Sequence, residues 1–227
     1  MPAPAWPDWF LRPWYRLNHA FIFASGTLGF SFRFEGVRHM PRRGPVLVVA
    51  NHQCFLDSVL VGLAVTRTLH YLARKSLFDN PVLGAFLPTV NVHPVDNAGA
   101  ATGGIKAVLE VLKAGHPVLL FPEGERTWTG KMQPLKAGVH LLAKRAPAPI
   151  LPVGIAGGFE AFPRTAKLPT LSPLFMPATR GALAASVGEP LDTERLLKLP
   201  REEFLQVVFD AIQAARHRAE RLRRKWG

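Results

Sequence analysis

A histidine and a carboxylate stand five residues apart in Asn51-His-Gln-Cys-Phe-Leu-Asp57, directly after a short apolar run. If that run is a strand and Asp57 opens the next helix, the two side chains can meet. Asp57 would accept a hydrogen bond from one ring nitrogen of His52 and stabilise the imidazolium. The other ring nitrogen could then take a proton from a hydroxyl group, as a general base does. The spacing alone is a weak signal, because structural histidines near helix starts are more common than catalytic pairs.

A second polar cluster follows another apolar run, in Phe121-Pro-Glu-Gly-Glu-Arg-Thr127. Gly124 lets the backbone approach a ligand closely, and the guanidinium of Arg126 presents donors matched to phosphate oxygens. The alternative is an exposed turn that carries a Glu–Arg pair. If both clusters follow parallel strands, they lie at the carboxyl-terminal edge of the sheet, where α/β folds place their sites.

Cys54 is the only cysteine, which excludes an internal disulfide and a cysteine-rich metal site. It lies in a turn only two residues from His52, so a nucleophilic role is disfavoured. No nucleophilic side chain is required for transfer from a group that is already activated, such as a thioester, because a base need only deprotonate the acceptor hydroxyl.

Alternating short strands and helices are expected to position both clusters. Apolar runs predict strands at residues 46–50, 69–73, 90–95, 117–121, 150–153 and 183–187, with Pro94 interrupting the third. Helices are predicted at residues 57–65, 105–112, 139–144 and 202–224, and residues 159–177 are predicted to be loop. This pattern is typical of a single α/β domain with a mixed, mostly parallel sheet flanked by helices.

The N-terminal segment, residues 1–34, combines aromatic and basic residues. Its uncharged run at residues 17–32 is shorter than the roughly 20 apolar residues that a membrane-spanning helix needs. Two interpretations remain open, contact with the headgroup layer of a membrane and ordinary packing of an N-terminal helix. The residues before the run that raise the question are Trp6, Trp9, Arg12, Trp14, Tyr15 and Arg16.

The net charge of +12 over 227 residues favours a polyanionic partner, whether nucleic acid, anionic lipid or a phosphorylated substrate. No nucleic-acid-binding module is recognisable, so nucleic acid is not expected as a partner. The basic end at residues 216–225 is better explained as a solvated helix terminus that complements its own dipole. A non-catalytic basic protein that binds lipid or nucleic acid is the alternative from a different class.

The two polar clusters, in this order, resemble the glycerolipid acyltransferase family, the family of the bacterial 1-acylglycerol-3-phosphate acyltransferases. The family's Asn-His-x4-Asp motif matches Asn51, His52 and Asp57. Its Phe-Pro-Glu-Gly-Thr-Arg-Ser motif matches residues 121–127, with Glu125 in place of Thr and Thr127 in place of Ser. The resemblance continues in Leu-Pro-Val at residues 151–153 and Lys-x-Gly at residues 136–138, and it runs from about residue 35 to residue 154.

The resemblance implies roles for these residues. His52 would be the general base and Asp57 its orienting partner. The acceptor's phosphate would be bound by Gly124 and Arg126, with Thr127 beside them. Glu123 would position the acceptor or organise the loop.

The family's second motif matches less well. Lys75 corresponds to its lysine and is expected to contact substrate, but the usual Val-Asp-Arg is here Val-Asp-Asn97. This change removes a charge from the acceptor site and leaves the acceptor open. The first expectation is the sn-2 hydroxyl of lysophosphatidic acid, and the alternative is another lysolipid such as a lyso-aminolipid.

Family members take the acyl group from acyl-CoA or acyl carrier protein and use no metal or prosthetic group. They sit on the cytoplasmic face of the membrane through N-terminal helices. The resemblance therefore implies a peripheral or monotopic enzyme in which residues 1–34 associate with the membrane surface and residues 35–227 form the acyltransferase domain.

Overall fold

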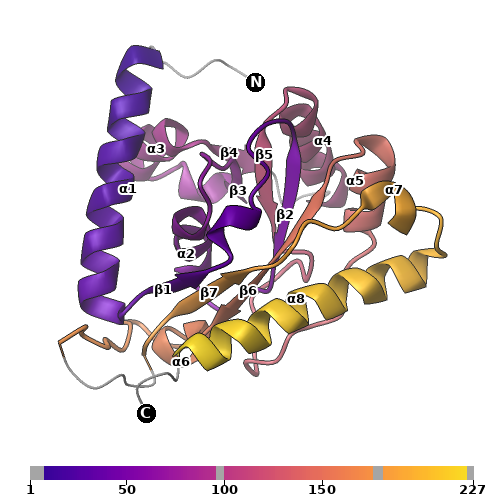
Figure 1. Cartoon of the computed structure of the whole chain (residues 1–227). Helices are drawn as coiled ribbons and strands as arrows, with labels where there is room; N and C mark the ends of the chain where they lie inside the picture. Colours follow the sequence, from indigo (N-terminus) through magenta and orange to yellow (C-terminus); the bar gives the residue numbers. More distant parts are fainter. Residues whose placement is uncertain (1–7, 96–99, 176–180, 224–227) are drawn as a thin grey trace.

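The computed structural model describes residues 8–95, 100–175 and 181–223 (Figure 1). Its elements are α1 (Asp8–Phe30), β1 (Arg33–Glu35), η1 (Val37–His39), β2 (Val46–Ala50), α2 (Asp57–Ala64), β3 (Tyr71–Arg74), η2 (Lys75–Leu77), α3 (Pro81–Phe86), η3 (Leu87–Val90), β4 (Val92–Val95), α4 (Ala100–Lys113), β5 (Pro117–Leu120), α5 (Gly138–Arg145), β6 (Ile150–Ala156), α6 (Gly158–Ala161), β7 (Ala184–Val187), α7 (Thr193–Leu196) and α8 (Arg201–Arg223).

The main sheet has the strand order β1-β7-β6-β2-β5. β2 pairs in parallel with both β5 and β6, β7 runs antiparallel to β6, and β1 runs parallel to β7. β3 and β4 form a separate parallel pair, which a parallel bridge from His70 to Val118 joins to β5. The expected mixed, mostly parallel sheet is confirmed. The carboxyl ends of β2, β5 and β6 therefore meet at one edge, directly before both polar clusters.

β2 is apolar throughout because both of its faces are covered. Val46, Val48 and Ala50 belong to a core cluster shared with α2, while Leu47 and Val49 belong to a second cluster formed with α4, α5 and α8. Figure 1 shows α1 and α2 on one side of the sheet and α5 and α8 on the other. The strand that carries His52 at its end is thus held rigidly in the middle of three layers.

Two predictions about local structure were wrong. Pro94 does not interrupt β4: within the described residues β4 has β3 as its one neighbour, and such an edge strand tolerates a residue without an N–H. Residues 159–161 are not loop but belong to α6: the chain turns at Gly157, whose φ is 88°, and the N–H of Ala161 donates to its carbonyl at 2.9 Å. Residues 176 and 177 of the predicted loop lie outside the described residues.

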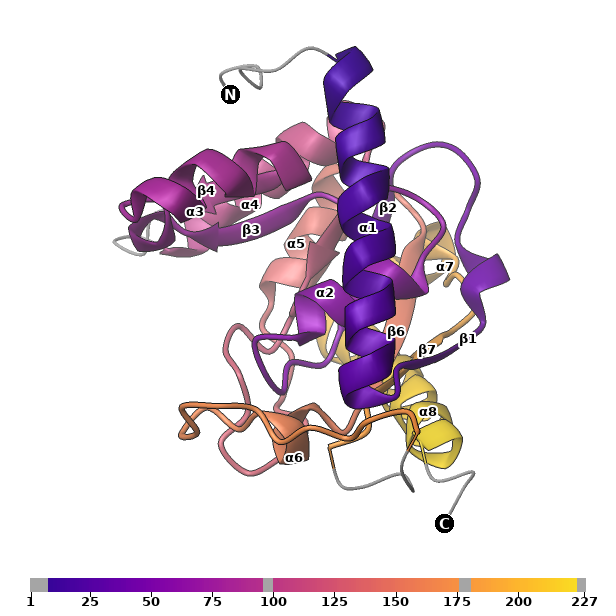
Figure 2. The same ribbon diagram turned by 90° about the vertical axis from the view of Figure 1, so that its left-hand side faces the viewer.

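α1 runs along the outer edge of the domain, in front of α2 in Figure 2. Ile22 and Phe30 pack against the core, and the indole N–H of Trp14 donates to the Thr89 hydroxyl at 3.0 Å. None of the helices in the described ranges has the length and apolar content to cross a membrane. Trp6 and the side chains of Trp9 and Arg12 lie outside the described part of the chain.

Candidate active site

The structure brings His52 and Asp57 together at the carboxyl end of β2. His52 Nδ1 lies 2.8 Å from Asp57 Oδ2. Asp57 is the first residue of α2 and is fully buried, whereas 19% of the His52 side chain is exposed. The His52 ring also stacks on Phe121, with centroids 3.9 Å apart and planes 10° apart. The imidazole is therefore held on one side by a carboxylate and on its face by an aromatic ring.

Asp57 is fixed by the turn that precedes its helix. Oδ2 accepts hydrogen bonds from the backbone N–H of Gln53 and, at 2.7 Å, of Cys54. The two N–H groups and the N-terminus of α2 direct positive partial charge toward this carboxyl group. Because Oδ2 is the acceptor of both backbone N–H groups, we assign it the acceptor role toward His52 as well, with the proton on Nδ1. Nε2 is then the nitrogen that can take a proton.

Cys54 is part of the same turn but is unsuited to act as a nucleophile. Its side chain is fully buried, and its Sγ donates to Asp57 Oδ1 at 3.3 Å. Burial, followed by repulsion from Asp57, raises the pKa of the thiol well above its usual range. The thiol therefore remains protonated near neutral pH.

Glu123 joins the two polar clusters through the backbone. Its Oε1 accepts from the N–H of His52 at 2.7 Å, and Oε2 accepts from the N–H of Gln133 at 2.6 Å. Burial raises the pKa of this carboxyl group, and the two hydrogen bonds oppose that rise. With both oxygens occupied by main-chain donors, Glu123 organises the loop after β5.

Thr127 also serves the loop. Its N–H donates to the His52 carbonyl at 2.9 Å, and its hydroxyl donates to the Lys131 carbonyl at 2.7 Å. The side chain is almost fully buried. The geometry assigns Thr127 to the loop rather than to a surface that a substrate could reach.

Gly124 is exposed and has a φ of 80°, a conformation that L side chains rarely adopt. A Cβ atom at this position would overlap the side-chain amine of Lys136. Lys136 is the lysine of the Lys-x-Gly sequence. Its backbone N–H donates to the Pro122 carbonyl at 2.8 Å. Lys136 was not among the predicted site residues, although the spacing of its motif could have indicated it.

Arg126 presents a guanidinium group that is suited to bind an anion at this edge. Its guanidinium carbon lies 3.7 Å from the centroid of the Phe55 ring, and its Nη1 is buried without a hydrogen-bond partner among the described residues. Burial, followed by the positive charges of Arg164 and Arg74, lowers the pKa of Arg126. A buried donor without a partner is costly unless a ligand satisfies it, and a phosphate oxygen would do so.

Arg164 is a residue of this edge that sequence reasoning missed. It donates to Glu125 Oε2 at 3.3 Å and to the Arg126 carbonyl at 3.2 Å, and its guanidinium lies over the Trp128 ring at 3.6 Å. It comes from the proline-rich stretch after α6, which shows no periodic pattern. Its partner Glu125 stands where the family usually has Thr, and that substitution was the available signal.

Lys75 begins η2 directly after β3, on an exposed part of the chain. The bridge between His70 and Val118 is parallel, so β3 ends at the same edge of the sheet as β5. Arg74, the residue before Lys75, is near enough to Arg126 to affect its pKa. Asn97 lies outside the described residues.

Two further residues hold the site edge together. The Asn51 amide donates to the Ile155 carbonyl at 3.1 Å and accepts from the Ile155 N–H at 2.8 Å. Gln53 accepts from the N–H of Gly158 at 3.0 Å. These bonds tie the end of β2 to β6 and α6. Across the described ranges, no three His, Cys, Asp or Glu side chains gather as a metal site would require.

Comparison with known proteins places this edge in a family context. Residues 31–156, more than half of the chain, match the family model described as Acyltransferase. The chain is 29% identical over 178 residues to a 1-acyl-sn-glycerol-3-phosphate acyltransferase of Bacillus subtilis, covering 77% of this chain and 80% of the relative. It is 30% identical over 190 residues to a protein of the same name from Saccharomyces cerevisiae, covering 82% of this chain and 59% of that relative.

The fold is also found among solved structures. The crystal structure of the 1-acyl-sn-glycerophosphate (LPA) acyltransferase PlsC from Thermotoga maritima superimposes with a TM-score of 0.71 at 23% identity. The match covers 96% of this chain and 80% of that chain. The likeness establishes the fold.

Proposed function

Since this chain belongs to the acyltransferase family, we propose that it moves a fatty acyl group from acyl-CoA or acyl carrier protein to the sn-2 hydroxyl of lysophosphatidic acid, forming phosphatidic acid. The observation that carries the proposal is the contact of 2.8 Å between His52 Nδ1 and Asp57 Oδ2. This contact leaves Nε2 as the base, at the edge where Arg126 presents a donor that has no partner among the described residues. The names of the Bacillus and yeast relatives support this choice of acceptor.

In the proposed reaction, His52 Nε2 takes the proton of the acceptor hydroxyl while the hydroxyl oxygen attacks the thioester carbonyl carbon. The carbon–sulfur bond breaks, and the departing thiolate takes the proton from the imidazolium. Asp57 holds the ring in place and stabilises the positive charge between the two transfers. No covalent acyl-enzyme is needed, in keeping with the buried thiol of Cys54. No metal or prosthetic group takes part in this scheme.

The acceptor's phosphate is proposed to bind beside Gly124, at the guanidinium of Arg126. The positive charges of Arg164 and Arg74 that lower the pKa of Arg126 would also attract a phosphate dianion. Together with Lys75, they supply cationic groups that offset the loss of the family's usual arginine at Asn97. Lysophosphatidic acid is therefore the first choice of acceptor.

Another lysolipid is the second candidate, because Asn97 carries no charge where the family usually has arginine. A panel of acceptors separates the two. Lysophosphatidate and lysolipids that lack a terminal phosphate are offered in parallel, and the products are identified by mass spectrometry. Faster acylation of a lipid without the phosphate would replace lysophosphatidate as the acceptor.

We place the enzyme at the membrane surface, as a peripheral or monotopic protein on the cytoplasmic face. Support comes from the net charge of +12 and from exposed apolar side chains on α1. Each basic residue close to an anionic bilayer adds about 1 kcal/mol to the binding free energy.

The test compares wild type with His52→Ala and with His217→Ala, a control that removes an exposed histidine on α8. Purified proteins are incubated with radiolabelled lysophosphatidate and either acyl-CoA or acyl carrier protein. We expect His52→Ala to lose about 10²-fold to 10⁴-fold in rate, the usual contribution of a general base, and His217→Ala to match wild type. Equal activity of His52→Ala would exclude it as the base, and a wild type inactive with every donor would overturn the function.

A further inference from the structure

The stretch after α6, residues 162–175, displays large apolar side chains to solvent. The exposed fractions are 81% for Leu168, 55% for Leu171, 52% for Leu174 and 77% for Phe175. Within these fourteen residues the only charged side chains are Arg164 and Lys167, both basic. We call this stretch the apolar loop. Solvent-exposed apolar groups this dense are uncommon on a protein surface that meets only water.

The backbone of the apolar loop is fixed to the end of α1. The N–H of Ser172 donates to the Gly29 carbonyl at 2.8 Å, and the N–H of Leu174 donates to the Leu28 carbonyl at 3.1 Å. The Ser31 hydroxyl donates to the Ser172 carbonyl at 2.7 Å. These bonds fix the backbone of the loop at Ser172 and Leu174. The leucine side chains of the loop remain more than half exposed.

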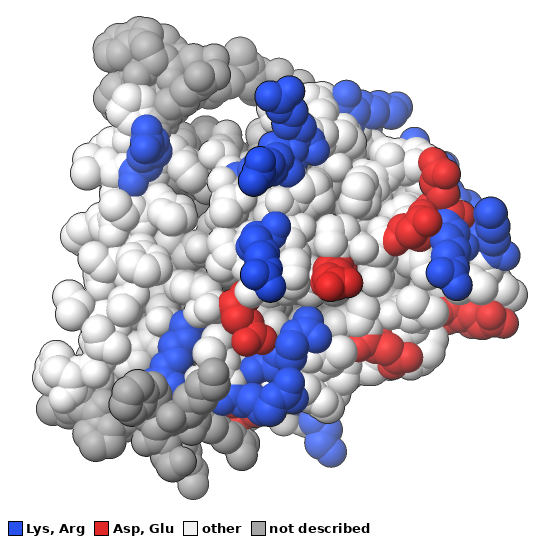
Figure 3. Space-filling view, viewed as in Figure 1, with Lys and Arg blue, Asp and Glu red and all other residues white. Residues whose placement is uncertain are grey.

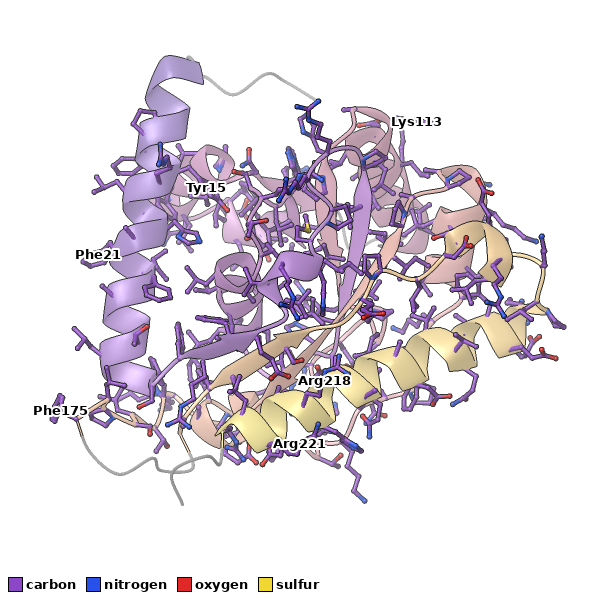
Figure 4. All side chains as sticks on the ribbon, in the orientation of Figure 1. Tyr15, Phe21, Lys113, Phe175, Arg218 and Arg221 are labelled. Atoms are coloured by element: carbon purple, nitrogen blue, oxygen red, sulfur yellow. The ribbon has the colours of Figure 1, made fainter. Side chains whose placement is uncertain are left out.

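α1 continues the same apolar surface. Its side facing the domain includes Ile22, while Leu17, Phe21 and Leu28 are 64%, 70% and 55% exposed. The spacing of these three residues, four and then seven, places them on one face of a helix. Figure 4 shows Tyr15 directed toward the domain, whereas Phe21 and Phe175 both lie on the outer side.

The charge around this surface suits an anionic bilayer. Residues 17–30 of α1 contain no Lys, Arg, Asp or Glu. Figure 3 shows an almost uncharged outer edge over α1, with lysines and arginines beside it. An uncharged apolar face bordered by basic groups is the arrangement of proteins that bind at the boundary of headgroups and acyl chains.

The other end of the apolar loop reaches the candidate active site. Arg164 bonds to Glu125 and to the Arg126 carbonyl. The ring of Phe162 lies 6.0 Å from that of Phe55, on which Arg126 rests. The loop therefore spans from the phosphate-binding edge to the end of α1.

We propose that the apolar loop is a membrane-inserting element. Together with the outer face of α1, it seats the protein on a bilayer that contains anionic lipid, with the apolar side chains of the loop among the acyl chains. Arg164 and Lys167 then lie at the headgroup level. This seating brings lipid in the membrane to the edge that carries His52. The binding itself does not depend on acyl transfer.

A fluorescent label at single positions of the loop tests this proposal. Leu168→Cys and Phe175→Cys are each labelled with nitrobenzoxadiazole, and Val82→Cys is the control because Val82 is 74% exposed on α3. The native Cys54 is buried, and wild type carried through the same reaction gives the blank. Vesicles of equal parts phosphatidylcholine and phosphatidylglycerol are then added.

We expect the emission at positions 168 and 175 to shift to the blue on vesicles and to be quenched by brominated acyl chains, while position 82 stays unchanged. A label that remains aqueous at both loop positions overturns the proposal. A blue shift without vesicles that grows with protein concentration also overturns it, and identifies a second copy of the chain as the occupant.

Sedimentation with the same vesicles gives an independent measurement. Because the replaced side chains are exposed, Leu168→Ser/Phe175→Ser should melt like wild type. Its partition onto vesicles should fall about tenfold or more, since two large apolar groups are lost from the bilayer boundary. Val82→Ser should partition as wild type does. Equal partition of the loop variant and wild type would contradict insertion, and this readout is independent of whether the protein acylates any lysolipid.

Discussion

At the residue scale, Asp57 is the most heavily engaged group of the candidate site. It receives the His52 ring, two backbone N–H groups and the Cys54 thiol, all within one turn at the start of α2. The carboxylate therefore both shapes the turn and sets which nitrogen of His52 is free. A substitution by asparagine separates the role of Asp57 toward His52 from its role in folding, because asparagine keeps the shape of the side chain and one acceptor oxygen.

Asp57→Asn should lower kcat by about 10²-fold to 10⁴-fold, because a neutral amide no longer stabilises the imidazolium that forms when Nε2 takes a proton. KM for the acceptor should change little, since Asp57 is buried and does not reach the surface where the phosphate is proposed to bind. Asp210→Asn, on the exposed side of α8, serves as the control. Steady-state kinetics with circular dichroism check this, and an unchanged kcat would refute the orienting role.

At the element scale, the close packing of α8 on β6 holds the edge of the site. Gly154 lies in β6, where a Cβ atom would overlap the backbone of Ala215 and Arg216 in α8. Its neighbour Ile155 makes both hydrogen bonds to Asn51. A helix pushed away from β6 would therefore disturb the end of β2 that carries His52.

Gly154→Ala should lower the free energy of unfolding by about 3 kcal/mol, because the added methyl group meets backbone that cannot move aside cheaply. Gly104→Ala in α4 is the matched control. In the described part of the chain no neighbouring atom lies within 4 Å of its added Cβ and its φ is not left-handed, so the substitution should stabilise the helix by about 0.5–1 kcal/mol. Urea unfolding measures both values. Similar effects of the two substitutions would show that α8 does not pack as closely as the structure indicates.

At the scale of the whole molecule, His70 joins the β3–β4 pair to the main sheet. Its N–H donates to the Pro117 carbonyl at 3.0 Å, and its carbonyl accepts from Leu119 at 2.9 Å. Its Nδ1 lies 2.8 Å from His93 Nε2, and the His116 ring stacks at 4.9 Å. Burial, followed by His93 and His116, lowers the pKa of His70 to about 4.

This lowered pKa predicts a loss of stability in acid. Between the folded pKa of about 4 and the ordinary value of 6.5, the unfolded chain binds more protons than the folded one, so the free energy of unfolding falls as the pH falls. From about pH 7.5 to about pH 5.5, His70 accounts for about 1 kcal/mol of that fall. Urea unfolding at the two pH values should show a smaller loss for His70→Gln than for wild type. His217→Gln should behave as wild type, and an equal loss for all three proteins would contradict the prediction.

Much of the fold could be predicted from local pattern. The apolar runs of β2 and β5 are short and bounded by polar residues. The helices α4 and α8 carry apolar residues at the spacing of one helix face. The predicted strand boundaries differ from the observed ones by a few residues where pairing with a neighbouring strand sets the end of a strand. Strand β3 begins two residues later than expected and β6 extends three residues farther. Such ends depend on which neighbouring strand is present, and a single run of sequence does not encode that.

The sequence by itself determined that His52 can meet Asp57 and that residues 121–127 form a loop near them. Both depend on short spacings and on parallel strands that end at the same edge of the sheet. Only the tertiary structure decided how Asn51 binds Ile155 and how Arg164 reaches Glu125. These contacts join residues 104 and 39 positions apart. They depend on the register of β6 beside β2 and on a proline-rich stretch without periodicity. Local pattern determines elements, whereas sheet order and packing determine which distant side chains meet.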